Sequence, residues 1–280
     1  MIIWIASFPK SGNTWLRMFL KSYFLKENEI FSLETSKKDT FLVKNFPDEK
    51  MLDQFNIDYS KFENIVKNWG NLQSYINLNN QTNYLKTHHA MCTIGPYKFT
   101  SNKYTKGAIY IVRDPRDVLV SYSHHLGLEY EETYKLISGT YHFEYPNSKI
   151  KQHMQYKQGL IGKWSDHYNS WKTCNLFKIL IIKYEDMIDD NYNTFLKVLE
   201  YLKEINSVEI NTIKIQSALK QTKFNELKKL EKKYGFNEKQ KGDFFFRVGK
   251  KNEWKNQLSK NIVDKIERIF EKEMKELGYL

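Results

Sequence analysis

Two stretches of the chain combine residue types that could bind phosphate groups. The first is the polar run "SFPKSGNT" at residues 7–14, which holds Lys10 and a glycine. Backbone N–H groups in such a loop can surround an anion, and glycine lets the anion approach closely. The second is "RDPRDVLVS" at residues 113–121, which begins with an arginine and ends with a serine. Because both groups form charge-assisted hydrogen bonds with phosphate, the sequence predicts two anion sites.

Each anion site also has a plainer interpretation that the sequence leaves open. The first loop could be an ordinary strand-to-helix turn with Lys10 exposed to solvent. The second stretch could hold a surface ion pair between Arg113 and Asp117, with Ser121 merely exposed on a helix. The occurrence of both stretches in one chain favours anion binding.

A third stretch could supply acid–base chemistry. The run "KTHH" at residues 86–89 places two of the seven histidines directly after an apolar segment. Histidine changes its protonation near neutral pH and is therefore a natural general base. Ligands of open α/β sheets gather at the carboxyl ends of the strands, where these histidines are expected. Most single histidines are structural or solvated. His88 and His89 are nevertheless candidates for the base, because two predicted anion sites accompany them in the chain.

Four apolar runs are expected to form the strands that position these residues. They are rich in apolar or β-branched side chains and lie at residues 1–7, 83–88, 108–114 and 178–186. Runs that are apolar on both faces suit the middle of a parallel sheet. Helical patterns lie between and around them, including a stripe on the last segment, residues 262–277. This alternation predicts an α/β fold, a three-layer sandwich with a central parallel sheet.

The composition limits the class of protein. The chain has 280 residues, of which 41% are hydrophobic, and a formal net charge of +11, which indicates polyanionic partners. Cys92 and Cys174 are too few for a disulfide scaffold or a zinc cluster and suggest a reducing compartment. No signal peptide and no apolar run of about 18 residues is apparent. The sequence therefore predicts a cytoplasmic protein without an integral membrane segment.

The first loop differs from the phosphate loop of ATP-hydrolysing enzymes. Of the pattern G-x-x-x-x-G-K-[ST], only Gly12 and Thr14 match. Ser7 replaces the first glycine and Asn13 replaces the lysine, which has moved to position 10. An ATP-dependent enzyme needs that lysine beside the β- and γ-phosphates and a carboxylate that holds a metal ion. The loop is thus predicted to hold a phosphate-like group without being a Walker A motif.

The run "FPKSGNTW" at residues 8–15 resembles the 5′-phosphosulfate loop of sulfotransferases that use 3′-phosphoadenosine 5′-phosphosulfate (PAPS). Their usual form is P-K-S-G-T-T-W, from which only Asn13 departs. In the family, the aromatic residue after the loop stacks on adenine, although core packing is an equally good interpretation for Trp15. The resemblance implies a P-loop-like site in which the donor is bound by Lys10, Ser11, Gly12, Asn13, Thr14 and Trp15.

The second anion stretch resembles the 3′-phosphate motif of the same family, in which an arginine and a serine eight residues later bind that phosphate. Arg113 and Ser121 match this pair. Weaker likenesses to the family's adenine pocket assign Tyr184 in "KYEDM", and Thr222 and Phe224 in "QTKFNEL", to donor binding. Core packing stays an alternative for Phe224.

A fourth stretch, "FRVGKKNEWKN" at residues 246–256, is similar to the family's R-K-G-x-x-G-D-W-K-N motif, which closes over the 3′-phosphate. Arg247 and Gly249 coincide with the motif and are expected to contact the donor, whereas Val248 replaces its lysine. The missing charge could come from Lys250 or from Lys251, and the sequence leaves that choice open.

The resemblance implies an enzyme, a PAPS-dependent sulfotransferase that transfers a sulfuryl group to a hydroxyl or amine and releases 3′,5′-adenosine bisphosphate (PAP). His88 matches the catalytic histidine of the family's K-T-H segment, and His89 is a competitor for this role. Lys10 would stabilise the bridging oxygen of the leaving group, and Lys86 would assist at the sulfuryl oxygens. Lysine, arginine and backbone amides would do this charge work, so no metal is implied.

The sequence does not identify the acceptor. A single sulfotransferase-like domain over residues 1–280 is expected, with lid or acceptor-loop insertions around residues 35–80, 127–160 and 228–250. Aromatic residues in the first two insertions suit an apolar or phenolic molecule but equally a packed lid. Small-molecule, glycan and lipid acceptors all stay open, as does the oligomeric state.

Three alternative functions stay open. A related nucleotide kinase is disfavoured by the displaced lysine, and a magnesium requirement would favour it. A basic nucleic-acid-binding protein without catalysis would use the charge of +11, but no known RNA-binding or zinc pattern accompanies it, so nucleic acid is not the expected partner. A degenerate sulfotransferase that binds the donor without turnover is suggested by Asn13 and Val248.

Overall fold

The computed structural model describes residues 1–26, 29–33, 41, 43–59, 61–139, 160–239 and 244–280. Contacts within the chain divide it into two compact units, which we call the sheet unit and the helical unit. The sheet unit comprises Met1–Phe8, Val43–Val112 and Leu136–Ile181. The helical unit comprises Pro9–Leu42, Arg113–Lys135 and Ile182–Leu280. Both candidate histidines therefore belong to the sheet unit, and all predicted donor-binding residues belong to the helical unit.

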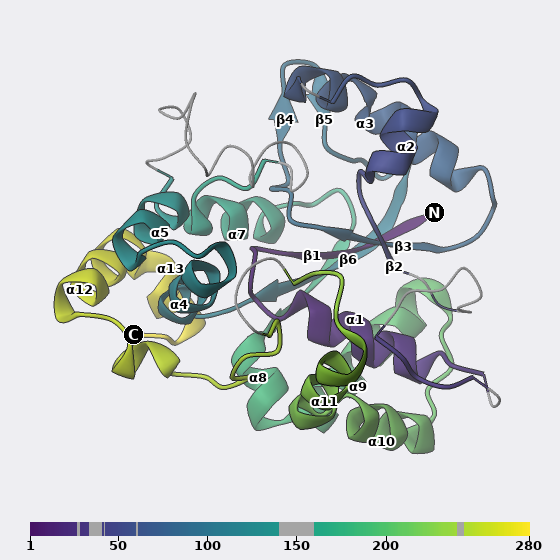
Figure 1. Ribbon diagram of the computed structural model, residues 1–280. Coiled ribbons are helices and arrows are strands. Elements are labelled where there is room, and N and C mark those ends of the chain that lie inside the picture. The colour runs from purple at the N-terminus through teal and green to yellow at the C-terminus, as the bar shows by residue number, and fades with distance from the viewer. Residues whose placement is uncertain (27–28, 34–40, 42, 60, 140–159, 240–243) are drawn as a thin grey trace. The chain divides into compact units, whose positions relative to one another are not determined.

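The sheet unit is built on a parallel sheet. In the described part of the chain this sheet has five strands in the order β2-β3-β1-β6-β7, with bounds Val43–Asn45, Asn83–Thr87, Ile2–Ser7, Thr105–Val112 and Lys178–Lys183 (Figure 1). β1 pairs in parallel with β3 on one side and with β6 on the other. All six residues of β1 are buried, as expected for a strand covered on both faces. The carboxyl ends of β1 and β3 are neighbours, because Ala6 is opposite Thr87.

Aromatic packing fixes the core of the sheet unit. The Trp4 ring lies 5.2 Å from the ring of Phe46 and 5.1 Å from that of Phe99. Its N–H donates to Thr105 Oγ1 at 2.9 Å, so the one polar atom of this buried side chain is satisfied. The other elements of the unit are the helices α2 Glu49–Gln54, α3 Phe62–Asn77 and α7 Trp164–Lys172, and the hairpin of β4 Thr93–Ile94 and β5 Tyr97–Lys98.

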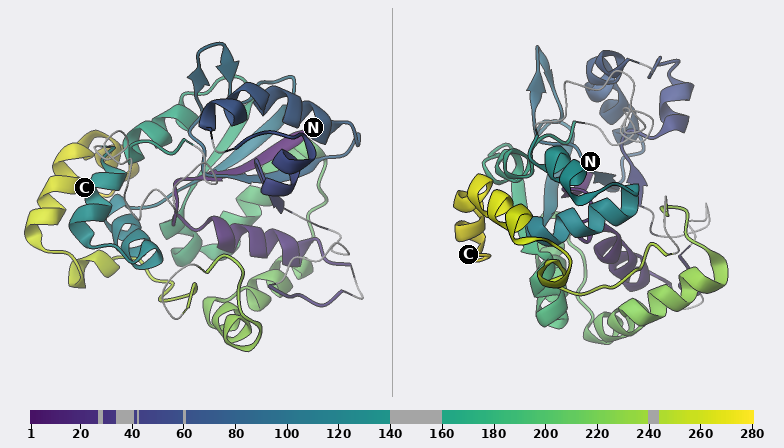
Figure 2. Two further views of the ribbon diagram at one scale, coloured as in Figure 1. Left: turned by 45° about the horizontal axis from the view of Figure 1, so that its top comes forward. Right: turned by 60° about the vertical axis from the view of Figure 1, so that its left-hand side comes forward.

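The helical unit contains most of the remaining helices. α1 contacts α10, α9 contacts α8 and α10, and α4 contacts α12. The purple helix α1 and the green helices of this unit can be followed in Figure 2. α5 Tyr130–Ile137 begins in this unit and ends in the sheet unit. The described helices of the unit are α1 Asn13–Tyr23, α4 Pro115–Leu126, α8 Tyr184–Asp189, α9 Asn191–Asn206, α10 Thr212–Gln221, α11 Phe224–Tyr234, the 3₁₀-helix η1 Glu253–Asn256, α12 Lys260–Ile269 and α13 Glu271–Leu277.

The predicted α/β fold with a central parallel sheet is confirmed, although three details differ. The run at 178–186 forms an edge strand that ends at Lys183, and its residues are mostly half-buried, because an edge strand has a neighbour on one side only. α8 begins directly after it, at Tyr184. β2 lies inside the range 35–80, which the sequence assigns to an insertion. The apolar stripe over 262–277 spans two helices, α12 and α13, which meet at Phe270.

Other expectations fall only partly on the described residues. Within the three predicted insertions, residues 35–40, 42, 60, 140–159 and 240–243 lie outside the described part of the chain. The expectation of one domain over residues 1–280 stays a prediction. Among the described helices, none combines the length and the apolar character that a bilayer crossing requires.

Candidate functional site

The loop after β1 has a backbone conformation that suits an anion site. It leaves the strand after Ser7 and enters α1 at Asn13. Lys10 has a φ of 65° and Gly12 has a φ of 99°, both in the left-handed region. A Cβ atom at Gly12 would also lie 2.5 Å from the Tyr184 ring. Position 12 therefore requires glycine for two reasons, its φ and the close approach of the Tyr184 ring.

The side chains of this loop contact a buried arginine. Asn13 Oδ1 accepts from Arg17 Nε at 2.8 Å, and Thr14 Oγ1 accepts from Arg17 Nη2 at 2.9 Å. The Glu238 carboxylate lies against the same pair, 2.7 Å from Arg17 Nη2 and 3.0 Å from Thr14 Oγ1. The Ser11 hydroxyl is buried and has no hydrogen-bond partner among the described residues. Such an atom is costly unless a ligand or water satisfies it, so Ser11 fits an anion-binding role.

Arg113 hydrogen-bonds both the loop and the stretch at residues 246–256, which we call the C-terminal stretch. Its Nη1 donates to the Lys10 carbonyl at 3.1 Å, and its Nη2 donates to the Lys250 carbonyl at 3.2 Å. The guanidinium lies 4.2 Å from the centre of the Tyr184 ring and 3.9 Å from the Asp117 carboxylate. Its Nε is buried without a partner in the described part of the chain. The alternative interpretation, an Arg113–Asp117 pair, is therefore present as a contact, but this pair is buried rather than on the surface.

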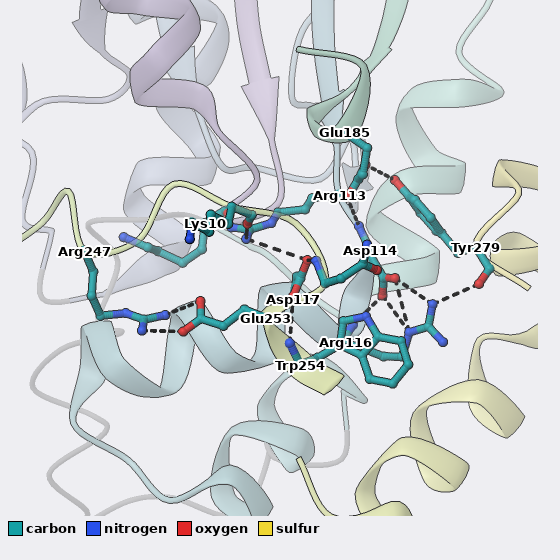
Figure 3. A network of polar contacts seen from close by, with 12 residues as sticks. Lys10, Arg113, Asp114, Arg116, Asp117, Glu185, Arg247, Glu253, Trp254 and Tyr279 are labelled. Atoms are coloured by element: carbon teal, nitrogen blue, oxygen red, sulfur yellow. Dashed lines mark hydrogen bonds and ion pairs between the residues drawn. The ribbon is translucent and has the colours of Figure 1, made fainter. Parts of the chain in front are cut away.

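Asp117 anchors the C-terminal stretch to α4. Its carboxylate accepts from the N–H of Asn252 at 2.7 Å and from that of Trp254 at 3.0 Å. Burial raises the pKa of Asp117, and the nearby Arg113 opposes that rise. Arg247 forms a two-point ion pair with Glu253, with N···O distances of 2.5 and 2.6 Å. Both arginines that were assigned to the 3′-phosphate thus face a carboxylate of the protein (Figure 3).

Other residues of the two 3′-phosphate motifs have diverse surroundings. Gly249 has a φ of 65°, and a Cβ atom there would collide with the Phe224 ring, so two assigned residues are in direct contact. The ammonium of Lys251 pairs with the Asp189 carboxylate, whereas Lys250 is exposed. Ser121 on α4 and Val248 are both half-buried.

Lys10 and three residues assigned to the adenine pocket make contacts of their own. The Lys10 ammonium lies 4.0 Å from the centre of the Phe245 ring, a cation–π contact. Trp15 packs against Tyr184 and is half-buried, and its N–H has no partner among the described residues. The buried Thr222 hydroxyl donates to the Ala218 carbonyl at 2.7 Å. Contact of these residues with adenine stays a prediction.

Sequence reasoning missed Arg116, which ties the C-terminal helices to the start of α4. Its guanidinium pairs with Asp114 at 2.7 Å and with Glu267 at 2.5 Å, and it donates to the Tyr279 carbonyl at 2.9 Å. The Trp254 ring covers it at 3.9 Å (Figure 3). Glu267 and Tyr279 are 151 and 163 residues away in sequence, so no local pattern could have indicated these two partners.

His88 has the tautomer that a general base needs. It follows β3, is half-buried, and places its Nδ1 2.8 Å from the Ser7 carbonyl oxygen. A carbonyl can only accept, so Nδ1 carries the proton and Nε2 carries the basic lone pair. The Ser7 hydroxyl lies 3.3 Å from the same nitrogen. Lys86 is on the same strand, opposite Ile5 of β1, and is half-buried.

His89 has a different environment and is 1% exposed. Its ring stacks on Phe62 and Phe99 and meets Trp69 edge-on. Its Nε2 accepts from the Leu160 N–H at 3.1 Å, so a backbone group already uses the lone pair. Burial lowers the pKa of His89 to about 3. These contacts describe a core histidine, and they favour His88 over His89 as the candidate base.

The two units therefore offer different chemistry. The sheet unit offers an imidazole with a defined tautomer. The helical unit offers arginines, a glycine loop and buried donors, among them Ser11 Oγ and Arg113 Nε, that have no partner among the described residues. Among the described residues, no group of three or more His, Cys, Asp or Glu side chains could hold a metal ion.

Comparison with known proteins agrees with this chemistry. The chain is 27% identical to a 3-alpha-hydroxysteroid sulfotransferase of Cavia porcellus, over 96% of this chain and 82% of the relative. It is 24% identical to an amine sulfotransferase of Oryctolagus cuniculus, over 98% of this chain and 81% of the relative.

Two solved structures share the fold. Mouse sulfotransferase SULT7A1 complexed with PAP has a TM-score of 0.61 and 19% identity, covering 98% of this chain and 84% of that one. Retinol dehydratase in complex with androsterone and the inactive cofactor PAP has a TM-score of 0.61 and 17% identity, covering 98% and 80%. The family model of the sulfotransferase domain matches residues 2–278. The chain belongs to the sulfotransferase family.

Proposed function

We propose that this protein transfers a sulfuryl group from PAPS to a hydroxyl or amine group of an acceptor, with His88 as the general base. The observation that carries the proposal is the hydrogen bond of 2.8 Å between His88 Nδ1 and the Ser7 carbonyl, which leaves the basic lone pair on Nε2. Family membership, and the PAP bound in the similar structures, support PAPS as the donor.

The donor-binding residues fit an anionic ligand. The Ser11 hydroxyl and Arg113 Nε are buried donors without partners in the described part of the chain, and a phosphate or sulfate oxygen could satisfy each of them. Lys251 is paired with Asp189, so Lys250 is the better candidate for the missing charge of the 3′-phosphate motif. The residues proposed to hold PAPS are Lys10, Ser11, Gly12, Asn13, Thr14, Trp15, Arg113, Ser121, Tyr184, Thr222, Phe224, Arg247, Val248 and Gly249.

In the proposed reaction His88 Nε2 accepts the acceptor proton while the acceptor oxygen or nitrogen forms a bond to sulfur. The bond between sulfur and the bridging oxygen breaks, and its electron pair stays on PAP. Lys10 stabilises that oxygen, and Lys86 stabilises the sulfuryl oxygens. General-base assistance contributes about 10²- to 10⁴-fold in rate. These charges come from the protein, so the proposed mechanism assigns no step to a metal.

The acceptor class follows from the relatives only in outline. Those reported above are named for a hydroxysteroid and an amine, which are small molecules. We propose a small-molecule acceptor first, and a glycan or lipid acceptor second. Part of the predicted acceptor loops, residues 35–40 and 140–159, lies outside the described residues.

Calorimetry with PAP tests the donor half of this proposal. We expect PAP to bind, and Arg113→Gln to weaken binding about 10- to 100-fold, because a hydrogen bond to a charged group contributes about 1.5–3 kcal/mol. Arg268→Gln, at an exposed position of α12, is the matched control and should change the affinity less than about twofold.

Binding of ATP with magnesium as tightly as PAP would contradict the 3′-phosphate assignment and favour the kinase alternative. Incubation of the protein with labelled PAPS and a panel of steroids, phenols, amines, glycans and lipids then tests transfer. Binding of PAP without transfer to any of them would favour the degenerate alternative.

A further inference from the structure

A closed ring of hydrogen bonds holds the proposed base in the sheet unit. His88 Nδ1 bonds to the Ser7 carbonyl at 2.8 Å, and the His88 carbonyl bonds to His167 Nε2 at 3.1 Å. His167 Nδ1 bonds to the Tyr110 hydroxyl at 2.8 Å. The Phe8 backbone also hydrogen-bonds the Tyr110 oxygen, and Phe8 follows Ser7 directly. The ring thus begins and ends at the carboxyl end of β1.

The direction of each hydrogen bond in the ring can be assigned. The His88 carbonyl can only accept, so His167 Nε2 carries a proton and donates it. Burial lowers the pKa of His167 to about 4, so the His167 imidazole is neutral at pH 7 and carries only one proton. Its Nδ1 must therefore accept from the Tyr110 O–H. Because burial raises the Tyr110 pKa well above its usual value, that hydroxyl keeps its proton.

Burial makes this arrangement rigid. Ser7, Tyr110 and His167 are 0% exposed and Phe8 is 1% exposed, whereas His88 is half-buried. His88 is therefore the one member of the ring that reaches toward solvent. A buried polar group that loses its partner destabilises the fold, so the ring resists rearrangement.

We propose that Tyr110 and His167 are positioning residues for His88. Their hydrogen bonds fix the carbonyl of His88, and thereby the place from which its imidazole reaches the Ser7 carbonyl and presents Nε2. This inference rests on the proposed function, because it assigns the ring to the base of that reaction. A shift of about 1 Å in a reacting group can cost roughly 100-fold in rate. The hydrogen bonds of the ring are therefore expected to affect the rate of transfer as well as stability.

A matched pair of variants at position 167 tests this. His167→Gln can keep a donor near the position of Nε2, whereas His167→Asn keeps a polar group near Nδ1 and loses the donor to the His88 carbonyl. We expect His167→Asn and Tyr110→Phe to lower kcat about 10- to 100-fold with KM for PAPS unchanged. We expect His167→Gln to recover most of the loss. Tyr201→Phe, a buried tyrosine of α9 outside the ring, is the control.

The ¹⁵N shifts of the His88 imidazole provide a readout that does not depend on activity. The wild type should show Nδ1 protonated and Nε2 unprotonated, and His167→Asn should show a mixture of tautomers. An unchanged His88 tautomer together with an unchanged kcat in folded variants would overturn the inference. So would an equal loss of kcat in the Gln and Asn variants with the tautomer unchanged. A wild type that lacks transfer but has the expected tautomer would instead refute the proposed function.

Discussion

The polar groups that hold the candidate base in the sheet unit and those of the proposed donor site in the helical unit are satisfied in different ways. In the sheet unit, the hydrogen bonds that hold His88 start and end on neutral groups of the same unit, and the residues behind it are fully buried. In the helical unit, Arg17, Arg113 and Arg247 each face a carboxylate, while the Ser11 hydroxyl and Arg113 Nε have no partner among the described residues.

This difference indicates two ways of preparing a site. A neutral ring needs no ligand, so the base should have its final geometry before any substrate binds. A desolvated guanidinium needs a counter-charge, and in the helical unit the protein supplies one from Asp117, Glu238 or Glu253. We therefore expect variants of the sheet unit to change catalysis and variants of the helical unit to change donor affinity.

The largest expected effect comes from removing the base. His88→Ala should lower kcat about 10²- to 10⁴-fold, because general-base assistance contributes that much. PAP affinity, measured by calorimetry, should stay within about twofold of wild type, because PAP lacks the sulfuryl group at which His88 is proposed to act.

His89→Ala is the matched control for that change. It removes a ring packed among Phe62, Trp69 and Phe99, so it should cost about 3–5 kcal/mol of stability, as for a buried aromatic. Loss of turnover in folded His89→Ala, with His88→Ala active, would show that the base is assigned to the wrong histidine.

An intermediate effect should appear in the pH dependence of stability. Burial lowers the pKa of His89 to about 3 and of His167 to about 4 from an ordinary 6.5. The unfolded chain then binds more protons below pH 6.5, so stability is complete above that pH and falls toward pH 4. The free energy of unfolding should fall by about 1.4 kcal/mol per pH unit for each histidine.

Urea unfolding between pH 4.5 and pH 7 measures this slope on wild type and on His167→Gln. The groups that face His167 are Tyr110 of β6, the Phe8 ring and the His88 carbonyl, and His89 is near enough to interact with it electrostatically. The variant should have a slope about 1.4 kcal/mol per pH unit smaller. Equal slopes would mean that His167 is not held neutral by burial, and the contrast between the units would weaken.

Local signals in the sequence predicted the central strands of the sheet and the loop that follows β1. The run at 1–7 contains the buried strand β1, and the run at 108–114 covers the buried part of β6 from residue 108 to Val112, because a strand covered on both faces must be apolar. The start of α4 has ordinary local signals, because Asp114 accepts from the Arg116 N–H at 2.9 Å and Pro115 is the first helical residue. The loop pattern predicted a functional need for glycine at position 12, and the φ of 99° explains why glycine is favoured there.

The partners of the site residues could not be predicted in this way. Glu238 reaches Thr14 across 224 residues, and His167 reaches Tyr110 across 57. Neither contact leaves a periodicity or a motif, because each depends on how distant segments pack. Residues 162–171, which include His167, carry no local signal of that contact for the same reason. β7 was misjudged as a central strand because an edge strand can also be apolar.

The smallest expected effect concerns Glu238, whose carboxylate bonds to the Thr14 hydroxyl that the proposed donor would use. If this carboxylate stands in for an anion in the helical unit, Glu238→Gln should raise PAP affinity about two- to fivefold in calorimetry, because a partly exposed ion pair contributes up to about 1 kcal/mol. Glu226→Gln, which removes an exposed partner of Lys229 on α11, is the matched control and should leave the affinity unchanged. A lower affinity in Glu238→Gln would mean that the carboxylate positions Thr14 for the donor, and the helical unit would then be as preorganised as the sheet unit.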